Sequence, residues 1–102
     1  MATVHITLSQ AETRALTRGT LQILDAAETS ADTITSSAMS QQSSITATNA
    51  TYVWSITADG GAVYLKFGSN PTAASDDGWY LMDGERLYLG ADVSQKVAVI
   101  DA

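Results

Sequence analysis

The chain has 102 residues, of which 45% are hydrophobic and none is cysteine, and its formal net charge is −6 at pH 7. Without cysteine it has neither disulfides nor a thiolate metal site, and five basic residues against eleven acidic ones are too few for a nucleic-acid-binding patch. An acidic surface repels anionic lipid and no segment reaches the roughly 20 apolar residues of a membrane span, so we expect one small soluble domain that binds neither nucleic acid nor membrane.

The first segment has the pattern of a half-buried β-strand. Over residues 3–8, Val4, Ile6 and Leu8 alternate with threonine and histidine, which places the apolar side chains on one face. A strand at this position can also add itself to the free sheet edge of a neighbouring molecule. We therefore expect a strand over residues 3–8 that either pairs within its own chain or is donated to a partner.

Residues 9–19 predict a short helix. Ser9 and Glu12 have the spacing of a capping box, in which each side chain satisfies a backbone amide at the start of a helix. Gly19 is the residue type that most often ends helices. Because the expected helix has only about two turns, packing against the rest of the chain would have to stabilise it.

Residues 20–24 alternate again and predict a second strand. They are followed by residues 25–44, a stretch rich in Ser, Thr, Ala and Gln, for which two interpretations remain open. This stretch is either a surface loop or a set of short edge strands, since threonine favours strands and residues 33–35 alternate. The single domain is thus expected to contain an N-terminal arm over residues 1–24, this segment, and a β-sandwich body over residues 45–102.

From residue 44 onward, short runs rich in β-branched and aromatic residues recur at regular spacing. The turns between them contain Gly, Asn and Asp, a pattern typical of an antiparallel β-sandwich or barrel. The pairs Asp59-Gly60 and Asp83-Gly84 suit tight hairpins, because glycine accepts the positive φ that these turns require. The six runs are SITAT, TYVWSITA, AVYLKF, GWYLM, RLYLG and KVAVI.

Two of these strands supply the centre of the expected core. Alternation places three apolar side chains on one face of each strand, and pairing the two faces across a hairpin would bury them. The fold that we expect is therefore mainly β, a small antiparallel β-sandwich of jelly-roll type with one short N-terminal helix. The core residues are Tyr52, Trp54 and Ile56 on the first strand and Val63, Leu65 and Phe67 on the second.

Reactive side chains are sparse and scattered. His5, the single histidine, lies on the polar face of its strand, where we expect an ordinary exposed or edge position. A grouping of Ser9, His5 and Asp25 carries no signal in a chain this rich in serine. Asp76 and Asp77 precede a glycine and are interpreted as a turn, because the spaced ligands of a calcium loop are missing. We expect no catalytic residue, no cofactor and no metal site.

The aromatic residues leave two interpretations open. Large aromatic side chains fill the cores of small β proteins, and exposed ones contribute to subunit contacts. Exposed Trp and Tyr side chains on a β-sandwich can alternatively stack against the rings of a carbohydrate. Tyr64 is expected to face outward because its neighbours in the strand are apolar, whereas Trp54 is expected in the core. The aromatic residues in question are Trp54, Tyr64, Trp79, Tyr80 and Tyr88.

The order of segments in the second half of the chain is distinctive. ITATNATYVWSI is followed by AVYLKFGSNPTA, then by WYLMDGERLYLG, and the chain closes on KVAVIDA. A strand of the form A-x-Y-x-K-F-G before a Ser/Asn-Pro-Thr-Ala loop resembles the small β-sandwich virion structural proteins of tailed bacteriophages, of the head decoration or head-fibre type. The resemblance covers a little over half of the chain, and the N-terminal third has no counterpart in that group.

This resemblance implies a non-enzymatic function in the virion. The expected role is a capsid decoration (cementing) protein that is made in the host bacterial cytoplasm, binds the major capsid protein on the outer surface of the head, and stabilises the assembled head. A homotrimer is expected, since copies can meet at a local three-fold axis. The alternatives are a head-fibre, neck or tail component, and a carbohydrate-binding β-sandwich module. The residues expected at the partner or oligomer interface are Val4, Ile6, Leu8, Tyr64, Asn70, Pro71, Trp79 and Tyr80.

Overall fold

The computed structural model of the chain describes residues 1–16, 19–24 and 28–102. All regular structure in these residues is β-strand, in agreement with the expected mainly β fold. The strands are β1 (Thr3–Leu16), β2 (Gly19–Leu24), β3 (Ser30–Thr35), β4 (Gln41–Gln42), β5 (Tyr52–Asp59), β6 (Val63–Gly68), β7 (Trp79–Leu81), β8 (Arg86–Gly90) and β9 (Lys96–Asp101).

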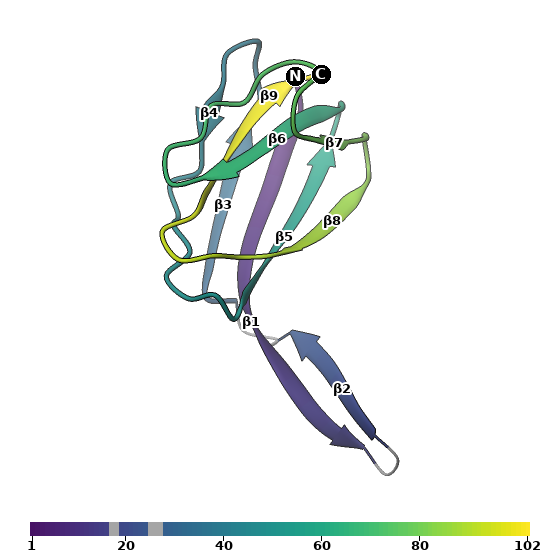
Figure 1. The fold of residues 1–102 in the computed structure, drawn as a ribbon. Coiled ribbons are helices and arrows are strands. Elements are labelled where there is room, and N and C mark those ends of the chain that lie inside the picture. Colours follow the sequence, from purple (N-terminus) through teal and green to yellow (C-terminus); the bar gives the residue numbers. More distant parts are fainter. Residues whose placement is uncertain (17–18, 25–27) are drawn as a thin grey trace.

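The strands form two antiparallel sheets that face each other (Figure 1). In the body of the first sheet, β1 and β5 are central and β3 and β8 are the edges, while β2 pairs with the far half of β1. The second sheet has the order β4-β9-β6-β7. From β3 onward the chain changes sheet at every connection except the one between β6 and β7, which pair with each other.

The prediction of a helix over residues 9–19 is wrong. Residues 9–16 belong to β1, and the described residues contain no helix. Gln10 lies opposite Tyr52 of β5, and residues 11–16 pair with β2 in antiparallel register. Cross-strand pairing gives every residue of this segment a partner, whereas a short helix is marginal unless it packs against something. Tertiary pairing therefore overrides the local capping pattern.

The core lies between the two sheets and takes apolar side chains from both. The ring of Trp54 on β5 lies 6.0 Å from that of Phe67 on β6, in the opposite sheet. The indole N–H of Trp54 donates a hydrogen bond to Gln95 Oε1 at 2.8 Å, so the polar atom of this buried ring has an acceptor. The buried residues of the core are Ala2, Val4, Ile6, Leu8, Ile34, Ala47, Trp54, Ile56, Ala58, Val63, Leu65, Leu81, Ala91, Val97 and Val99.

The two strand faces expected to form the core do meet, but β5 and β6 are not a hairpin. They belong to different sheets, because β5 is already paired with β1 and β8, and β6 with β7 and β9. The turn at Asp59-Gly60 carries the chain from one sheet to the other, and the turn at Asp83-Gly84 carries it back. The prediction of a tight hairpin at each of these two turns is therefore wrong. The two turns are joined instead, since Gly60 N–H donates to Asp83 Oδ1 at 2.9 Å.

The segment rich in Ser, Thr and Ala contains strands, which agrees with the edge-strand interpretation. β3 pairs with β1 at one edge of the first sheet, and β4 pairs with β9 at one edge of the second. Of the six expected runs, SITAT forms no named strand and contributes one isolated bridge, between Ala47 and Gln95. Because β1 is central, the body takes strands from all three expected parts of the chain.

β2 and the far half of β1 form a two-stranded hairpin that extends beyond the sandwich body (Figure 1). Its register runs from the Ala11–Leu24 pair to the Leu16–Gly19 pair. The molecule is correspondingly elongated, with principal extents of 49 × 26 × 22 Å. A single strand, β1, is thus shared between the body and the hairpin.

Gly78 occupies a position where a larger residue does not fit. Its φ is +85°, and a Cβ atom there would overlap the carbonyl oxygen of Leu65 on β6. Gly84 has a similar φ of +79°, but nothing lies within 4 Å of the place a Cβ would take. Substitutions at the two glycines can therefore separate the free-energy cost of positive φ from the free-energy cost of a close contact.

We expect Gly78→Ala to lower the free energy of unfolding more than Gly84→Ala does. Both variants place an L-residue at positive φ, which costs roughly 1–2 kcal/mol. At Gly78 alone the added methyl group also overlaps backbone, which adds about 1–3 kcal/mol. Urea unfolding of the two variants measures the difference, and equal losses would contradict the close approach of Gly78 to β6.

Candidate functional site

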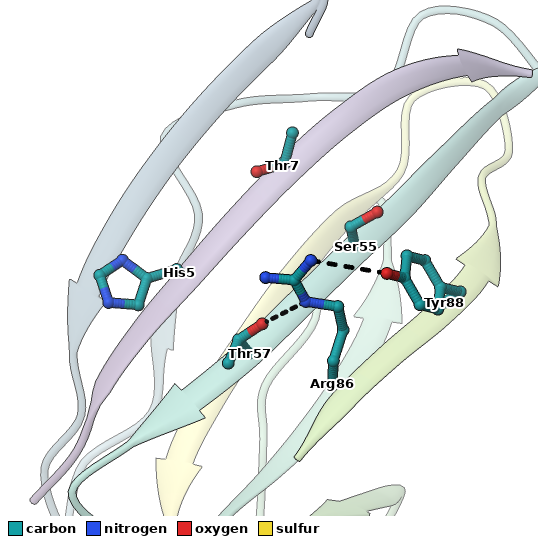
Figure 2. A pocket seen from close by; sticks show the side chains of 6 residues that line it. All are labelled: His5, Thr7, Ser55, Thr57, Arg86 and Tyr88. Carbon is teal, nitrogen blue, oxygen red and sulfur yellow. Dashed lines mark hydrogen bonds between the residues drawn. The ribbon is translucent and has the colours of Figure 1, made fainter. Parts of the chain in front are cut away.

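The outer face of the first sheet carries a shallow polar concavity (Figure 2). Its volume is about 170 Å³, and it spans the neighbouring strands β1, β5 and β8. Its side chains form two rows across the sheet, because the register places His5 opposite Thr57, and Thr57 opposite Arg86. The lining residues are His5, Thr7, Ser55, Thr57, Arg86 and Tyr88.

Strand periodicity explains why these side chains lie on the outside. On β5, Trp54 and Ile56 are buried in the core, so Ser55 and Thr57 point to the opposite face. The same alternation applies to β1 and β8, whose exposed or half-buried polar residues share this face. The polar site is therefore the reverse side of the strands that build the core.

The guanidinium of Arg86 lies over the concavity and has no carboxylate partner among the described residues (Figure 2). Its Nε–H donates to Thr57 Oγ1 at 2.9 Å, and Nη1 lies 3.5 Å from Tyr88 Oη, which is long for a hydrogen bond. Most donors of the guanidinium fork thus have no acceptor in the part of the chain that the structure describes. None of the lining residues is acidic, so this is a locally positive place on a chain of net charge −6.

Ser55 adds a second unused polar group. Its Oγ is buried and has no hydrogen-bond partner among residues 1–16, 19–24 and 28–102. The register places Ser55 between Thr7 of β1 and Tyr88 of β8. Buried hydroxyl groups are usually hydrogen-bonded, so an unpartnered one beside a concavity marks a place where a ligand or a water molecule can bind.

The sequence pattern did not predict this site. From the sequence, His5 is expected to be an ordinary polar residue and Tyr88 an aromatic residue with two possible roles, and neither is grouped with Arg86. His5 is exposed, as expected, although its strand is central in the sheet rather than at an edge. The alternation of hydroxyl residues along β1 and β5 was the available signal, but alternation does not reveal which strands are neighbours.

Three of the expected interface residues lie in the core. Val4, Ile6 and Leu8 are 0%, 1% and 0% exposed, and their strand is paired on both edges within the chain. Their side chains fill the interior, so in this fold they do not reach a partner. Residues 3–8 pair within their own chain on both edges, which is the first of the two alternatives expected for this segment.

Tyr64 and Tyr80 come together on the outer face of the second sheet. They lie opposite each other on β6 and β7, and their ring centroids are 5.1 Å apart. Tyr64 Oη donates a hydrogen bond to Asp76 Oδ1 at 3.1 Å. Trp79, the neighbour of Tyr80 on β7, is 49% exposed. Three of the expected interface residues thus lie along the β6–β7 edge.

Asn70 and Pro71 lie in the loop after β6, at the other edge of the second sheet. Gln42 of β4 donates hydrogen bonds to Asn70 Oδ1 at 2.8 Å and to the Pro71 carbonyl oxygen at 2.9 Å. Asn70 is exposed and Pro71 is buried. Because β4 and β7 are opposite edges, the structure does not join this loop to the tyrosine pair.

The acidic turn is a structural element, as expected. Asp76 has a φ of 63°, and Asp77 forms an ion pair with Lys66 at 3.2 Å. Within the described residues, no three His, Asp or Glu side chains are grouped as metal ligands. Asp25, the third member of the weak serine-histidine-aspartate grouping, lies outside those residues.

Comparisons with known proteins leave this site to be interpreted from its own geometry. No family model, curated protein or solved structure matches the chain. Among residues 1–16, 19–24 and 28–102, none forms a helix with the length and apolarity that a membrane crossing requires. The concavity around Arg86 and the β6–β7 edge are two surface features of the described residues.

Two serine substitutions are expected to have opposite effects on stability. Ser36, which is 0% exposed, accepts a hydrogen bond from Ala2 N–H at 2.7 Å and donates one to Asp101. Ser36→Ala should therefore cost about 1–3 kcal/mol, because it leaves buried polar groups unpaired. Ser55→Ala removes a hydroxyl without a partner and should leave the free energy of unfolding unchanged within about 0.5 kcal/mol, or raise it.

Thermal and urea unfolding of both variants, beside the parent chain, measure this contrast. A loss of stability in Ser55→Ala as large as that in Ser36→Ala would mean that the Ser55 hydroxyl is in fact paired. Such a result would contradict the description of this hydroxyl as an unused group in the concavity.

The hydrogen bond to Asp76, with the negative charge of that carboxylate, raises the pKa of Tyr64 above its ordinary value. The folded state thus holds the Tyr64 proton more tightly than the unfolded chain, so this contribution to stability is present below the pKa of an unfolded tyrosine and is lost as the pH rises through the folded pKa. Asp76→Asn keeps a residue type that tolerates positive φ and removes the charge.

We expect Asp76→Asn to lower the pKa of Tyr64 towards the ordinary tyrosine value. An alkaline titration of the tyrosine ring carbons by NMR measures each pKa separately. Tyr52 and Tyr88 serve as internal controls, since neither contacts Asp76. An unchanged Tyr64 pKa in the variant would contradict the effect of the Asp76 carboxylate on Tyr64.

Proposed function

We propose that the protein is a non-enzymatic structural protein of a tailed-bacteriophage virion, a capsid decoration protein that binds the outer surface of the assembled head and stabilises it. Its partner is the major capsid protein, and it acts as a homotrimer. The proposal combines the resemblance of residues 45–102 to that group with one feature of the structure, the hairpin of β1 and β2.

The fold is compatible with this role. Two antiparallel sheets joined by a chain that changes sheet at nearly every connection follow the scheme of a jelly roll, an architecture found in viral capsid and lectin domains. We infer that the body is a jelly-roll variant in which β1 supplies a central strand. An architecture hosts many functions, so this agreement supports the proposal by analogy alone.

The hairpin carries the proposal. Ala11 N–H bonds the carbonyl oxygen of Thr51 and so points away from β2. Successive N–H groups along an antiparallel strand point to alternate sides, so the N–H of Thr13, two residues further on, points to the same outer edge as that of Ala11. The N–H of Gln22, the partner of Thr13 on β2, points outward at the opposite edge of the hairpin. No described strand pairs with either outer edge beyond Ala11. Unpaired edges are templates for strand addition, and an isolated two-stranded hairpin is marginal in water.

Association through these edges would stabilise the hairpin and build a symmetric oligomer. In a cyclic trimer one edge of each hairpin meets the other edge of the next, so a single contact is used at every interface. Binding to an assembled shell then stabilises the shell by mass action, because the decoration protein binds the folded, assembled state alone. The negative net charge favours contact with basic or mixed regions of the shell.

The same features are compatible with a head-fibre, neck or tail component. A specific observation also favours a second function, carbohydrate binding: Trp79 and Tyr80 are each 49% exposed on adjacent positions of β7. Trp54 is fully buried, so a change in tryptophan fluorescence on adding a neutral sugar would report on Trp79. Unchanged fluorescence across a panel of neutral sugars would remove this alternative.

The double variant Thr13→Pro/Gln22→Pro tests the hairpin edges. It removes one N–H from each outer edge and leaves the bonds between β1 and β2 in place. We expect the parent chain to have the mass of a trimer by size exclusion with light scattering, and this variant to be monomeric. The parent should also co-sediment with shells assembled from the major capsid protein encoded in the same genome, and the variant should not.

The matched control is Arg14→Pro/Leu21→Pro, at the adjacent cross-strand pair. Its N–H groups point inward, so it should disrupt the hairpin itself, which cross-strand NMR contacts detect. An oligomer that survives Thr13→Pro/Gln22→Pro would contradict association through the edges. A parent chain that neither self-associates nor binds the shell would contradict the capsid role.

A further inference from the structure

We propose that the concavity on the outer face of the first sheet is a binding site for an acidic sugar residue, with the carboxylate of a uronate held by Arg86. The site is independent of the proposed capsid role, since it uses side chains of β1, β5 and β8 and no group of the hairpin. Three observations carry the proposal: the state of Arg86, the state of Ser55, and the size and lining of the concavity.

Arg86 has the donors that a carboxylate needs. Its Nε–H is bonded to Thr57 Oγ1 at 2.9 Å, which fixes the orientation of the guanidinium over β5 (Figure 2). The remaining N–H groups have only the long contact to Tyr88 Oη in the described part of the chain. A planar guanidinium fork held in this way presents two parallel N–H groups, the arrangement that binds a carboxylate with two hydrogen bonds.

Ser55 supplies a further donor beside Arg86. Its buried Oγ lacks a partner among the described residues, and a bound ligand that accepts a hydrogen bond from it would satisfy this atom. Thr7, its register partner on β1, adds another hydroxyl that can donate or accept. The site thus combines a cation, which selects an anion, with hydroxyl groups, which suit the ring hydroxyls of a sugar.

The size and the aromatic wall favour one sugar ring. A volume of about 170 Å³ is well below the roughly 300–1,000 Å³ of sites for drug-sized ligands. Tyr88 is 55% exposed, so its ring is free to contact the apolar face of a sugar at the rim of the site. A carboxylate without a ring would use the Arg86 end and leave Tyr88 and Thr7 without contacts.

Charge is compatible with a single uronate. The net charge of −6 is spread over the whole chain, and no lining residue is acidic. At physiological ionic strength, charges more than about 8 Å apart are largely screened. The local charge of Arg86 therefore decides whether an anion binds here.

The test is an NMR titration of the full chain with sodium glucuronate, at ionic strength balanced with sodium chloride. Glucose tests the ring without the carboxylate, and acetate tests the carboxylate without the ring. We expect glucuronate to shift the amide signals of β1, β5 and β8 saturably. Its affinity should be at least about tenfold higher than that of glucose, which lacks the charged hydrogen bond, and than that of acetate, which lacks the neutral hydrogen bonds of the ring.

Arg86→Gln should weaken glucuronate binding by at least about tenfold, because a charge-assisted pair is lost. Lys66→Gln is the matched control: it removes the same charge from the second sheet and should leave the affinity unchanged. Ser55→Ala should weaken binding several-fold without lowering the stability of the free protein. Effects of Arg86→Gln and Lys66→Gln of equal size would mean that the net charge, and not this site, controls binding.

Three further results would overturn the proposal. Equal affinity for glucose and glucuronate would remove the role of the Arg86 charge. Equal affinity for acetate and glucuronate would remove the sugar, and no saturable shift with glucuronate would remove the site. None of these results bears on the capsid role, which the hairpin variants and the shell-binding assay test separately.

Discussion

The pairing of β1 with both β3 and β5 is the constraint on which the rest of the structure depends. Residues 3–8 are hydrogen-bonded on both edges, so their side chains have only two directions to take. Ile6 and its apolar neighbours enter the core, and His5 and Thr7 enter the polar concavity. A shift of one residue in register would exchange the two faces. The core and the candidate binding site are therefore two results of one register.

The same strand also determines where the hairpin begins. β1 pairs with β3 as far as Leu8 and with β5 as far as Gln10, and from Ala11 it continues with β2 alone. The body thereby sets the direction in which the outer edges of the hairpin present their N–H groups. Assembly through these edges would use backbone groups, and ligand binding on the sheet face would use side chains. The two proposed interactions can consequently occur in one molecule without competing for the same atoms.

Buried polar groups at structural positions differ from the one at the candidate site in whether they have a hydrogen-bond partner. The indole N–H of Trp54 has an acceptor in Gln95, and the hydroxyl of Ser36 has partners in Ala2 and Asp101. Those atoms are needed to hold the two sheets and the ends of the strands in place. Ser55 is different, because its buried hydroxyl has no partner in the described part of the chain. That contrast, and not residue type, singles out the concavity.

The sequence by itself determined that the fold is mainly β, where most strands of the second half lie, and which face of each strand is apolar, because alternation with a period of two is a local property. It also determined that His5 faces outward. Only the tertiary structure decided that residues 9–16 are a strand, that β5 and β6 lie in different sheets, and that Arg86 lies beside Ser55. These features depend on which strands are neighbours, and hydrogen bonds between strands far apart in the chain leave no periodic trace in the sequence of either one.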